Sequence, residues 1–426
     1  MEQITNSSKE IIRSSNTKKS EKVKPFPFNP FSAGFRANPY PVYHRLLFEN
    51  PICHTVGGDW VLTRYKHIKT ILRDSRVYSD NRPKLIQQKS KYFRNLGKSI
   101  QTLADTSNKF LFYMNPPDHT RLRRLASKAF SPVVIEGMRP QIQTIVDEAL
   151  DEVRNKGEMD IIADLAELLP LKVIASMLGV PPNDAQEQLH QWSHILSRIL
   201  DPLISLEEYE AINKAILEFQ EYFRKLISKR EKDPQDDIIS YLIAARDDSD
   251  KLSEEEVLST CILLFMAGEE TTVNTIGNGM LALLNYPEQM EKLKQEPKII
   301  QTAVEEMLRY DSPVQMAGRI ASEKLEIGGQ TIQKGEKMHL CLGSANRDPD
   351  QFPHPDRFDV LRQENNHLAF GDGIHYCLGA ALARTQAEIA INSLIEQLPN
   401  LKLASDKLEW RKNIVLRGLK ALPVKF

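Results

Sequence analysis

The sequence has 426 residues, of which 41% are hydrophobic and 27% are charged, an ordinary balance for a globular protein. Its formal net charge of −1 creates no overall field that would attract nucleic acid or an anionic membrane, so we expect neither as a partner. The four cysteines are far apart and form no disulfide framework, which is typical of a protein from a reducing cytoplasm.

The first 24 residues are rich in Ser, Lys and Glu and contain few apolar side chains. We predict a disordered tail over residues 1–24 and a single folded domain over residues 25–426. The polar start does not resemble a signal peptide. No apolar run reaches the roughly 20 residues that a membrane span needs. We therefore expect a soluble, cytoplasmic protein.

Short elements are predicted before residue 113. We expect a helix around Tyr40–Glu49, two strands within Ile52–Leu62 around Gly57-Gly58, and a helix over Tyr65–Arg73. Residues 80–112 have the least regular pattern, with Lys and Arg scattered among Leu, Ile and Phe. They are predicted to form either a solvated connector or a loop with short helical pieces that covers a pocket.

A helix is predicted to open after Asn115-Pro116-Pro117, because proline suits the first turn of a helix. In it His119 and Arg123 are four residues apart and share a face, which suits a carboxylate or a phosphate. A basic helix face is more often simply solvated. From Val133 to Arg230 the pattern is helical, and the interrupted apolar stretch Trp192–Leu206 indicates a flap between two helices.

The longest predicted helix begins with a capping box at Ser253 and Glu256 and runs to about Asn285. It is apolar on nearly all sides through Leu264, so we expect it to cross the interior. The polar segment Ala267–Thr272 at mid-span is out of place in a buried helix, because a buried carboxylate needs a partner. It predicts a locally distorted helix beside a ligand, or alternatively a surface stripe that begins at Glu269.

A further helix is predicted over Ile299–Tyr310, and it contains a Glu-x-x-Arg pair, Glu306 and Arg309. The same spacing occurs elsewhere in the chain and is a weak signal by itself, because exposed pairs contribute little. Strand patterns follow over residues 313–342. Val415–Phe426 is predicted to be a hairpin around Gly418.

The stretch from Phe370 to Gly379 places Cys377 among three glycines and just before a helical run to about Glu396. A lone cysteine is usually a small buried apolar residue. Here the glycines would let a flat ligand approach the backbone, and the helix N-terminus would favour a thiolate. A fixed thiolate is a metal ligand, and haem iron is one metal that proteins bind through a single cysteine.

Taken together, these motifs resemble the cytochrome P450 family over about residues 25–426. Phe370–Gly379 resembles its haem-binding loop, and Ala267–Thr272 resembles its oxygen-activation segment. Glu306 and Arg309, with Arg357, resemble its structural Glu-Arg-Arg triad. The resemblance implies a mainly α (α+β) fold of triangular outline with a small β region. The haem would lie between the long central helix and the cysteine loop.

The resemblance also implies a set of site residues. Cys377 would be the axial ligand of haem b (iron protoporphyrin IX). Side chains that hold the haem propionates would be His119, Arg123, Arg319 and His375. Further haem contacts would be Ala267, Gly268, Phe370, Gly371, Gly373 and Gly379. Thr271 would hydrogen-bond dioxygen and Glu270 would help relay protons through water.

Substrate contacts follow only from family analogy. They would come from Leu263, Val314, Met316, Val415 and Leu416, together with segments 81–105 and 192–206. Each of these is equally compatible with plain core packing. Their apolar character suits a mid-sized lipophilic substrate.

The function that the resemblance implies is that of a haem-thiolate monooxygenase of secondary metabolism that hydroxylates or epoxidises such a molecule. The chain contains no flavin motif and no iron–sulfur cysteine cluster. Two electrons would therefore come from a ferredoxin or flavodoxin with its reductase, and a basic patch of Arg124, Lys128 and Arg384 is one candidate docking face. The substrate would arrive free or tethered to a carrier protein.

Three alternatives stay open at this point. The same site would also serve oxidative coupling or desaturation, or a peroxygenase that runs on hydrogen peroxide. The third is a non-catalytic haem-thiolate sensor. The pair Glu270–Thr271 favours activation of dioxygen over the sensor, because a sensor needs no proton relay.

Overall fold

The computed structural model describes residues 28–55, 57–80, 82–181, 186–201, 204–244 and 252–426. The predicted tail, residues 1–24, lies outside this part of the chain. The α-helices are α1 Ala33–Ala37, α2 Tyr40–Glu49, α3 Tyr65–Arg73, α4 Arg82–Asn95, α5 Gln101–Ser107, α6 Asp118–Ser127, α7 Pro132–Gly137, α8 Arg139–Val153, α9 Leu168–Met177, α10 Gln186–Ser197, α11 Leu206–Lys232, α12 Ile238–Ala244, α13 Glu254–Asn285, α14 Pro287–Gln295, α15 Ile300–Tyr310, α16 Leu342–Ala345 and α17 Ala380–Gln397. Other helical turns are η1 Leu111–Tyr113, η2 Lys128–Phe130, the π-helical η3 Ile162–Ala166, η4 Arg198–Leu200, η5 Pro297–Ile299 and η6 Gly373–His375.

The strands are β1 Ile52–His54, β2 Trp60–Leu62, β3 Val77–Ser79, β4 Glu158–Asp160, β5 Met316–Ala321, β6 Leu325–Ile327, β7 Gln330–Ile332, β8 Lys337–Cys341, β9 Lys402–Leu403 and β10 Pro423–Lys425. In the described residues the largest sheet has the order β1-β2-β8-β5-β3. Only its β2–β8 pair is parallel, with Trp60 opposite Met338. The sheet thus combines strands from both ends of the chain.

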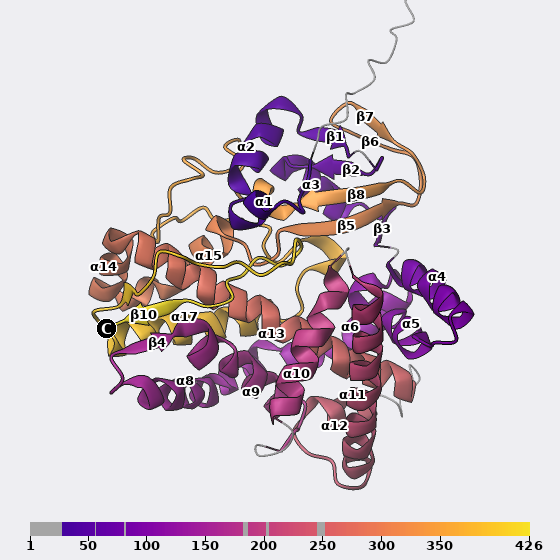
Figure 1. Cartoon of the computed structure of the whole chain (residues 1–426), viewed down its shortest axis with the longest axis horizontal. Helices are drawn as coiled ribbons and strands as arrows, with labels where there is room; N and C mark the ends of the chain where they lie inside the picture. Colours follow the sequence, from indigo (N-terminus) through magenta and orange to yellow (C-terminus); the bar gives the residue numbers. More distant parts are fainter. Residues whose placement is uncertain (1–27, 56, 81, 182–185, 202–203, 245–251) are drawn as a thin grey trace, which may run out of the picture.

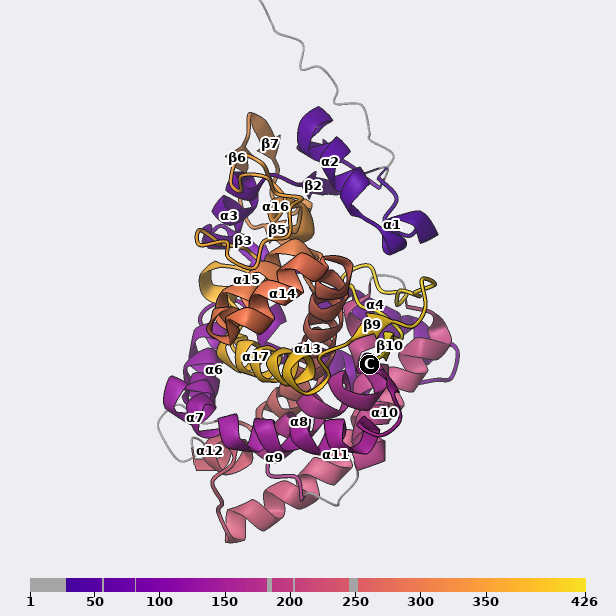
Figure 2. The same ribbon diagram turned by 90° about the vertical axis from the view of Figure 1, so that its left-hand side faces the viewer.

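Helices dominate the rest of the molecule, as predicted. The large sheet lies at one end with α1, α2 and α3, and helices α8 to α12 lie at the other end (Figure 1). Helix α13 runs between them, with α17 and α15 alongside (Figures 1 and 2). Among the described residues, no helix has both the length and the hydropathy that crossing a bilayer requires.

Helix α13 begins as predicted and is continuous. The Ser253 hydroxyl accepts a hydrogen bond from the Glu256 N–H at 3.2 Å, and the Glu256 carboxylate accepts one from the Ser253 N–H at 2.8 Å. Its 32 residues give a length of about 48 Å. The prediction of a local distortion is wrong, because the backbone stays α-helical through Ala267–Thr272. The threonine hydroxyls there donate to carbonyls one turn earlier, which places them in a helix without breaking it.

Three predictions of local structure need correction. Residues 80–112 are more regular than expected, because α4 and α5 each bury one face, with Ile86 and Phe93 of α4 and Leu103 of α5 in the core. Trp192–Leu206 is not a loop in its first half, since α10 continues to Ser197 and η4 to Leu200. The chain turns back between Trp410 and Leu419 rather than at Gly418, and β10 pairs with β4 and β9.

Candidate active site

The cysteine loop is held by its own backbone just before α17. The Cys377 N–H donates to the Phe370 carbonyl at 2.9 Å, and the Tyr376 N–H donates to the Gly373 carbonyl at 3.1 Å. Gly371 and Gly373 have φ values of +72° and +68°, a conformation that side chains rarely adopt. These bonds fix the position of Cys377 at the entry to the helix.

Gly373 has a second role that the sequence did not reveal. A Cβ atom at this position would collide with the carbonyl oxygen of Leu72, at the end of α3. Beside it, Arg73 Nε lies 3.0 Å from the Asp372 carboxylate. The missing side chain therefore lets protein pack on protein here, whereas we expected it to admit a ligand.

The Cys377 thiol combines a deep position with accessible surface. Burial raises the pKa of this thiol, and the Gly379 N–H, Arg123 and Arg384 lower it less strongly. The Gly379 N–H and the two guanidinium groups favour the thiolate, whereas burial opposes it, so the thiolate stays a prediction. The residue is nevertheless exposed by its accessible surface. This combination is typical of a side chain that borders an internal cavity.

Two histidines lie beside this loop with unsatisfied nitrogens. The ring centroids of His119 and His375 are 4.4 Å apart. Among the described residues, neither buried Nε2 atom has a hydrogen-bond partner. Burial, together with Arg319, His119 and Arg123, lowers the pKa of His375 to about 3. Two neutral imidazoles beside guanidinium groups need an acceptor in this place.

The two arginines of the predicted set belong to the same region. Burial lowers the pKa of Arg319 to about 10, which Asp80 opposes, so this cation lies in an unfavourable setting without a strong counter-ion. Arg123 Nη2 donates to the Tyr376 carbonyl at 2.5 Å. The structure therefore brings His119, Arg123, Arg319 and His375 together around the cysteine loop.

These residues fit a haem. Two orphaned imidazole nitrogens and two guanidinium groups suit a pair of propionate carboxylates. A single thiol on a rigid loop suits a ligand to haem iron. Cys377 would bind the metal, and the four cationic or imidazole side chains would bind the propionates.

Helix α13 is accessible at one place in its interior course. Val257 to Met266 are all buried, whereas Ala267 is exposed and Gly268, Glu270 and Thr271 are half-buried. The Thr271 hydroxyl donates to the Ala267 carbonyl at 2.9 Å. The alternative of a surface stripe is wrong, because Glu269 is only 5% exposed. A polar patch on an interior helix indicates a face toward a cavity.

The predicted Glu-Arg-Arg triad is correct in two of its three members. Glu306 and Arg309 are fully buried and form a two-pronged ion pair, with N–O distances of 2.7 and 2.8 Å. The third arginine is Arg362, whose Nε lies 3.0 Å from Glu306. The assignment of Arg357 to the triad is wrong, because its side chain is 63% exposed and only its backbone carbonyl accepts a hydrogen bond from Arg309. Sequence could not separate them, since both arginines follow the same Pro-Asp pair.

Arg384 is 29% exposed and is paired, so its part in a docking patch stays a prediction. It makes a two-pronged ion pair with Glu305, at 2.6 and 2.9 Å, and lies over the Phe370 ring. His367 contacts the same carboxylate at 3.3 Å. Arg124 and Lys128 are exposed, as predicted. Glu305 and His367 were missed, although Glu305 directly precedes Glu306.

The predicted substrate contacts fall into two groups. Val314 pairs with Leu416 in a β-bridge beside Val415, and the Gln315 N–H donates to the Val415 carbonyl at 2.8 Å. Leu263, Met316 and Leu416 are buried in the core. Core packing accounts for these three, and a pocket role remains a prediction for all five.

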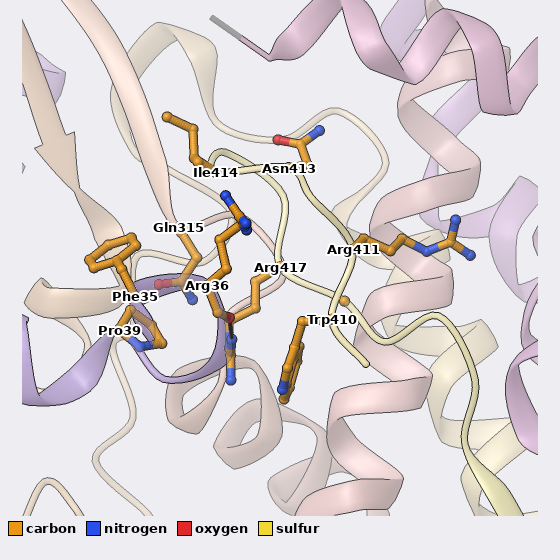
Figure 3. A pocket seen from close by; sticks show the side chains of 10 residues that line it. Phe35, Arg36, Pro39, Gln315, Trp410, Arg411, Asn413, Ile414 and Arg417 are labelled. Carbon is orange, nitrogen blue, oxygen red and sulfur yellow. Dashed lines mark hydrogen bonds between the residues drawn. The ribbon is translucent and has the colours of Figure 1, made fainter. Parts of the chain in front are cut away.

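A small hollow lies between α1 and the C-terminal segment (Figure 3). Arg36, Trp410 and Arg417 are among its lining residues. In Figure 3 Arg411 extends away from these side chains toward a neighbouring helix.

Comparison with known proteins agrees with this arrangement. Residues 61–409 match the family model described as Cytochrome P450. The biotin biosynthesis cytochrome P450 of Bacillus subtilis strain 168 is 44% identical over 398 residues, which cover 93% of this chain and 98% of that relative. The polyketide biosynthesis cytochrome P450 PksS of the same organism is 40% identical over 407 residues, with coverage of 93% and 98%.

Among solved structures, one similar to this chain is P450BioI in complex with an acyl carrier protein ligated with hexadec-9Z-enoic acid. It is 43% identical, has a TM-score of 0.87, and is matched over 93% of this chain and 100% of its own.

Proposed function

The chain belongs to the cytochrome P450 family of monooxygenases, and on that premise we propose that it hydroxylates or epoxidises a mid-sized lipophilic molecule with haem b as its cofactor. The observation that carries the proposal is the pairing of a deep, accessible Cys377 thiol with an accessible polar patch on the interior helix α13. The thiol supplies a metal ligand, and the polar patch supplies groups that accept and donate protons.

The residues divide the work as follows. Haem iron, when bound, supplies the activation of dioxygen with two electrons. Cys377 would bind the iron, and the hydrogen-bonded loop keeps the sulfur in one position. Thr271 offers a hydroxyl at the accessible face of α13, and Glu270 offers a carboxylate one residue earlier. Together they hold and deliver the protons that reduction of oxygen to water consumes.

Electrons come from separate proteins in this proposal, a ferredoxin or flavodoxin with its reductase. The sequence has four scattered cysteines and no flavin motif. Ile374 and Tyr376 are 50% and 40% exposed on the cysteine loop, close in sequence to the metal ligand. With the exposed Arg124 and Lys128, they suit an acidic redox partner.

For the substrate we propose a long acyl chain carried by an acidic carrier protein. The complex of the relative P450BioI supports this. Helix α4 supports it independently, because its sequence contains no Asp or Glu and its Lys84, Lys89 and Lys91 are exposed. Leu85 and Tyr92 on this helix are 45% and 49% exposed. A surface with positive charge around apolar side chains suits an acidic partner.

The decisive experiment is the absorption spectrum of the dithionite-reduced protein under carbon monoxide. A strongly red-shifted Soret band is expected for a haem with a thiolate ligand. Cys377→Ala should abolish this band. Cys53→Ala, which changes a buried core cysteine, should leave its position unchanged. A folded, haem-supplemented protein without the band would exclude the proposed function.

Substrate binding is then tested by spin-state titration. Hexadec-9Z-enoic acid and its acyl carrier protein conjugate are compared, and the conjugate should bind more tightly. The double variant Lys89→Glu and Lys91→Glu should weaken binding of the conjugate and leave binding of the free acid unchanged. Equal binding of both forms would leave a free lipophilic substrate as the better proposal. Faster turnover with peroxide alone than with the electron-transfer proteins would favour the peroxygenase, and no turnover with either would favour the sensor.

A further inference from the structure

Glu269 is a buried carboxyl group that the proposed function leaves without a role. Its side chain is 7% exposed and lies on α13, directly before Glu270. Burial raises its pKa to about 7. Near neutral pH this group therefore exchanges a proton readily, inside the helix that carries the oxygen-activation residues.

His190 connects Glu269 to solvent. It lies on α10, which packs against α13, and its side chain is 42% exposed. Its Nδ1 is 3.7 Å from Glu269 Oε1, and its Nε2 is 3.9 Å from Glu167 Oε2. The interaction with Glu269 raises the pKa of His190, which burial and Arg411 oppose and Glu167 assists. An imidazole with two separate nitrogens can take up a proton on one side and release it on the other.

Arg411 holds the other two carboxylates of the cluster. Its Nη2 lies 2.5 Å from Glu167 Oε1, and its Nε lies 3.8 Å from Glu270 Oε1. The guanidinium group stays charged and does not transfer protons at ordinary pH. It therefore keeps Glu167 and Glu270 in place beside the histidine without competing for the proton.

The charges of this cluster do not balance when every carboxyl group is ionised. Three carboxyl groups, Glu167, Glu269 and Glu270, face one guanidinium group and one imidazole. The groups that shift the pKa of Glu269 are His190, Glu270 and Glu167. Since Arg411 contacts Glu167 and Glu270, the extra proton belongs to the pair His190–Glu269.

We propose that His190 and Glu269 form the entry of a proton route from solvent to Glu270 and Thr271, with Glu269 as the group that stores the proton. The inference rests on the proposed function. Water protonates His190, the imidazole passes a proton to Glu269, and a bridging water carries it from Glu269 to Glu270. Each dioxygen consumed draws two protons through this route, and bulk water replaces both.

Turnover of the haem-loaded full chain tests the route. Glu269→Gln and His190→Gln are compared with His44→Gln, a partly exposed histidine that pairs with Asp356 elsewhere. With reductase and ferredoxin, product per dioxygen consumed should fall about tenfold in the first two variants only. The dependence of the rate on pH should flatten around neutrality. Turnover driven by hydrogen peroxide, which brings its own protons, should stay unchanged.

A second measurement does not depend on activity. Infrared spectra of the ferric protein, recorded across pH, should show a protonated carboxyl band that titrates near neutrality. The band should disappear in Glu269→Gln and should titrate at higher pH in His190→Gln, because His190 lowers the pKa of Glu269. Glu269→Asp should keep a titrating carboxyl band and should retain part of the product formed per dioxygen consumed.

Three outcomes would overturn the route. The first is an unchanged yield of product per dioxygen in both variants. The second is an equal loss of peroxide-driven turnover, which would indicate a purely structural contact. The third is the absence of a titrating carboxyl band. A missing Soret band in the unsubstituted protein would instead remove the proposed function itself.

Discussion

Arg362 Nε lies 3.0 Å from Glu306 Oε2, the same oxygen that Arg309 Nε reaches at 2.7 Å. The Asp359 N–H and the Asn365 amide also donate to this carboxylate. One buried anion therefore ties α15 to the segment that leads into the cysteine loop. A buried charge of this kind is stable only while its donors remain.

The first prediction concerns the choice between two arginines. Arg362→Ala should lower the free energy of unfolding by about 2–4 kcal/mol, because it removes one partner of a buried anion. Arg357→Ala should change it by less than about 0.5 kcal/mol, since that side chain is largely exposed. Urea unfolding of the two variants, with haem retention measured in parallel, checks this. Equal effects would contradict the assignment.

The second prediction concerns the contact between Gly373 and Leu72. Gly373→Ala adds a collision with backbone to the strain of a positive φ. Gly329→Ala is the matched control, because its φ is +79° but the space around it is empty. The control should lower the free energy of unfolding by about 1 kcal/mol. Gly373→Ala should lower it several times more and should also reduce haem incorporation. Thermal unfolding and the ratio of Soret to protein absorbance measure both effects.

The third prediction concerns the hydroxyl of Thr271. Thr271→Ala should divert electrons into hydrogen peroxide and reduce product per electron pair by about tenfold or more. Thr272→Ala removes the same type of hydrogen bond from the next residue, which is buried. It should leave coupling unchanged at a small cost in stability. Peroxide and product are measured together in one assay, and similar coupling in both variants would argue against a role for Thr271.

The fourth prediction is a dependence of stability on pH. Burial tends to raise the pKa of Glu305, but His367 and Arg384 outweigh it and lower the value from 4.5 to about 2. A carboxyl group with a depressed pKa in the folded state stabilises the protein fully above its unfolded pKa. That contribution is lost as the pH falls from about 4.5 toward about 2.

Glu305→Gln should accordingly be less stable than the unsubstituted protein by about 1–3 kcal/mol near neutral pH. The difference should narrow between about pH 5 and about pH 3. Glu221→Gln is the control, because this exposed residue pairs with Lys225 in solvent. Chemical unfolding across pH measures the difference in free energy of unfolding between Glu305→Gln and the unsubstituted protein. A difference that widens in acid would contradict the predicted direction of the pH dependence.

Much of the local structure could be predicted from the residues alone. The helices Tyr40–Glu49 and Tyr65–Arg73 and the capping box at Ser253 follow from periodicity and capping, which depend on neighbours within four residues. The cysteine loop was found in the same way, because its glycines and Cys377 occur within ten positions. Residues 80–112 were misjudged because the face that α4 buries is narrow and its sequence is rich in lysine, and because α5 has only seven residues.

The sequence by itself determined the candidate groups for the chemistry: one cysteine on a glycine-bound loop, and a threonine with carboxylates inside a long apolar helix. Only the tertiary structure decided the partners, because these are chosen by packing between segments that are distant in the chain. It selected Arg362 over Arg357, paired Arg384 with Glu305, and set His190 beside Glu269. Ion-pair energies fall steeply with distance and burial, and neither quantity can be read from spacing along the chain.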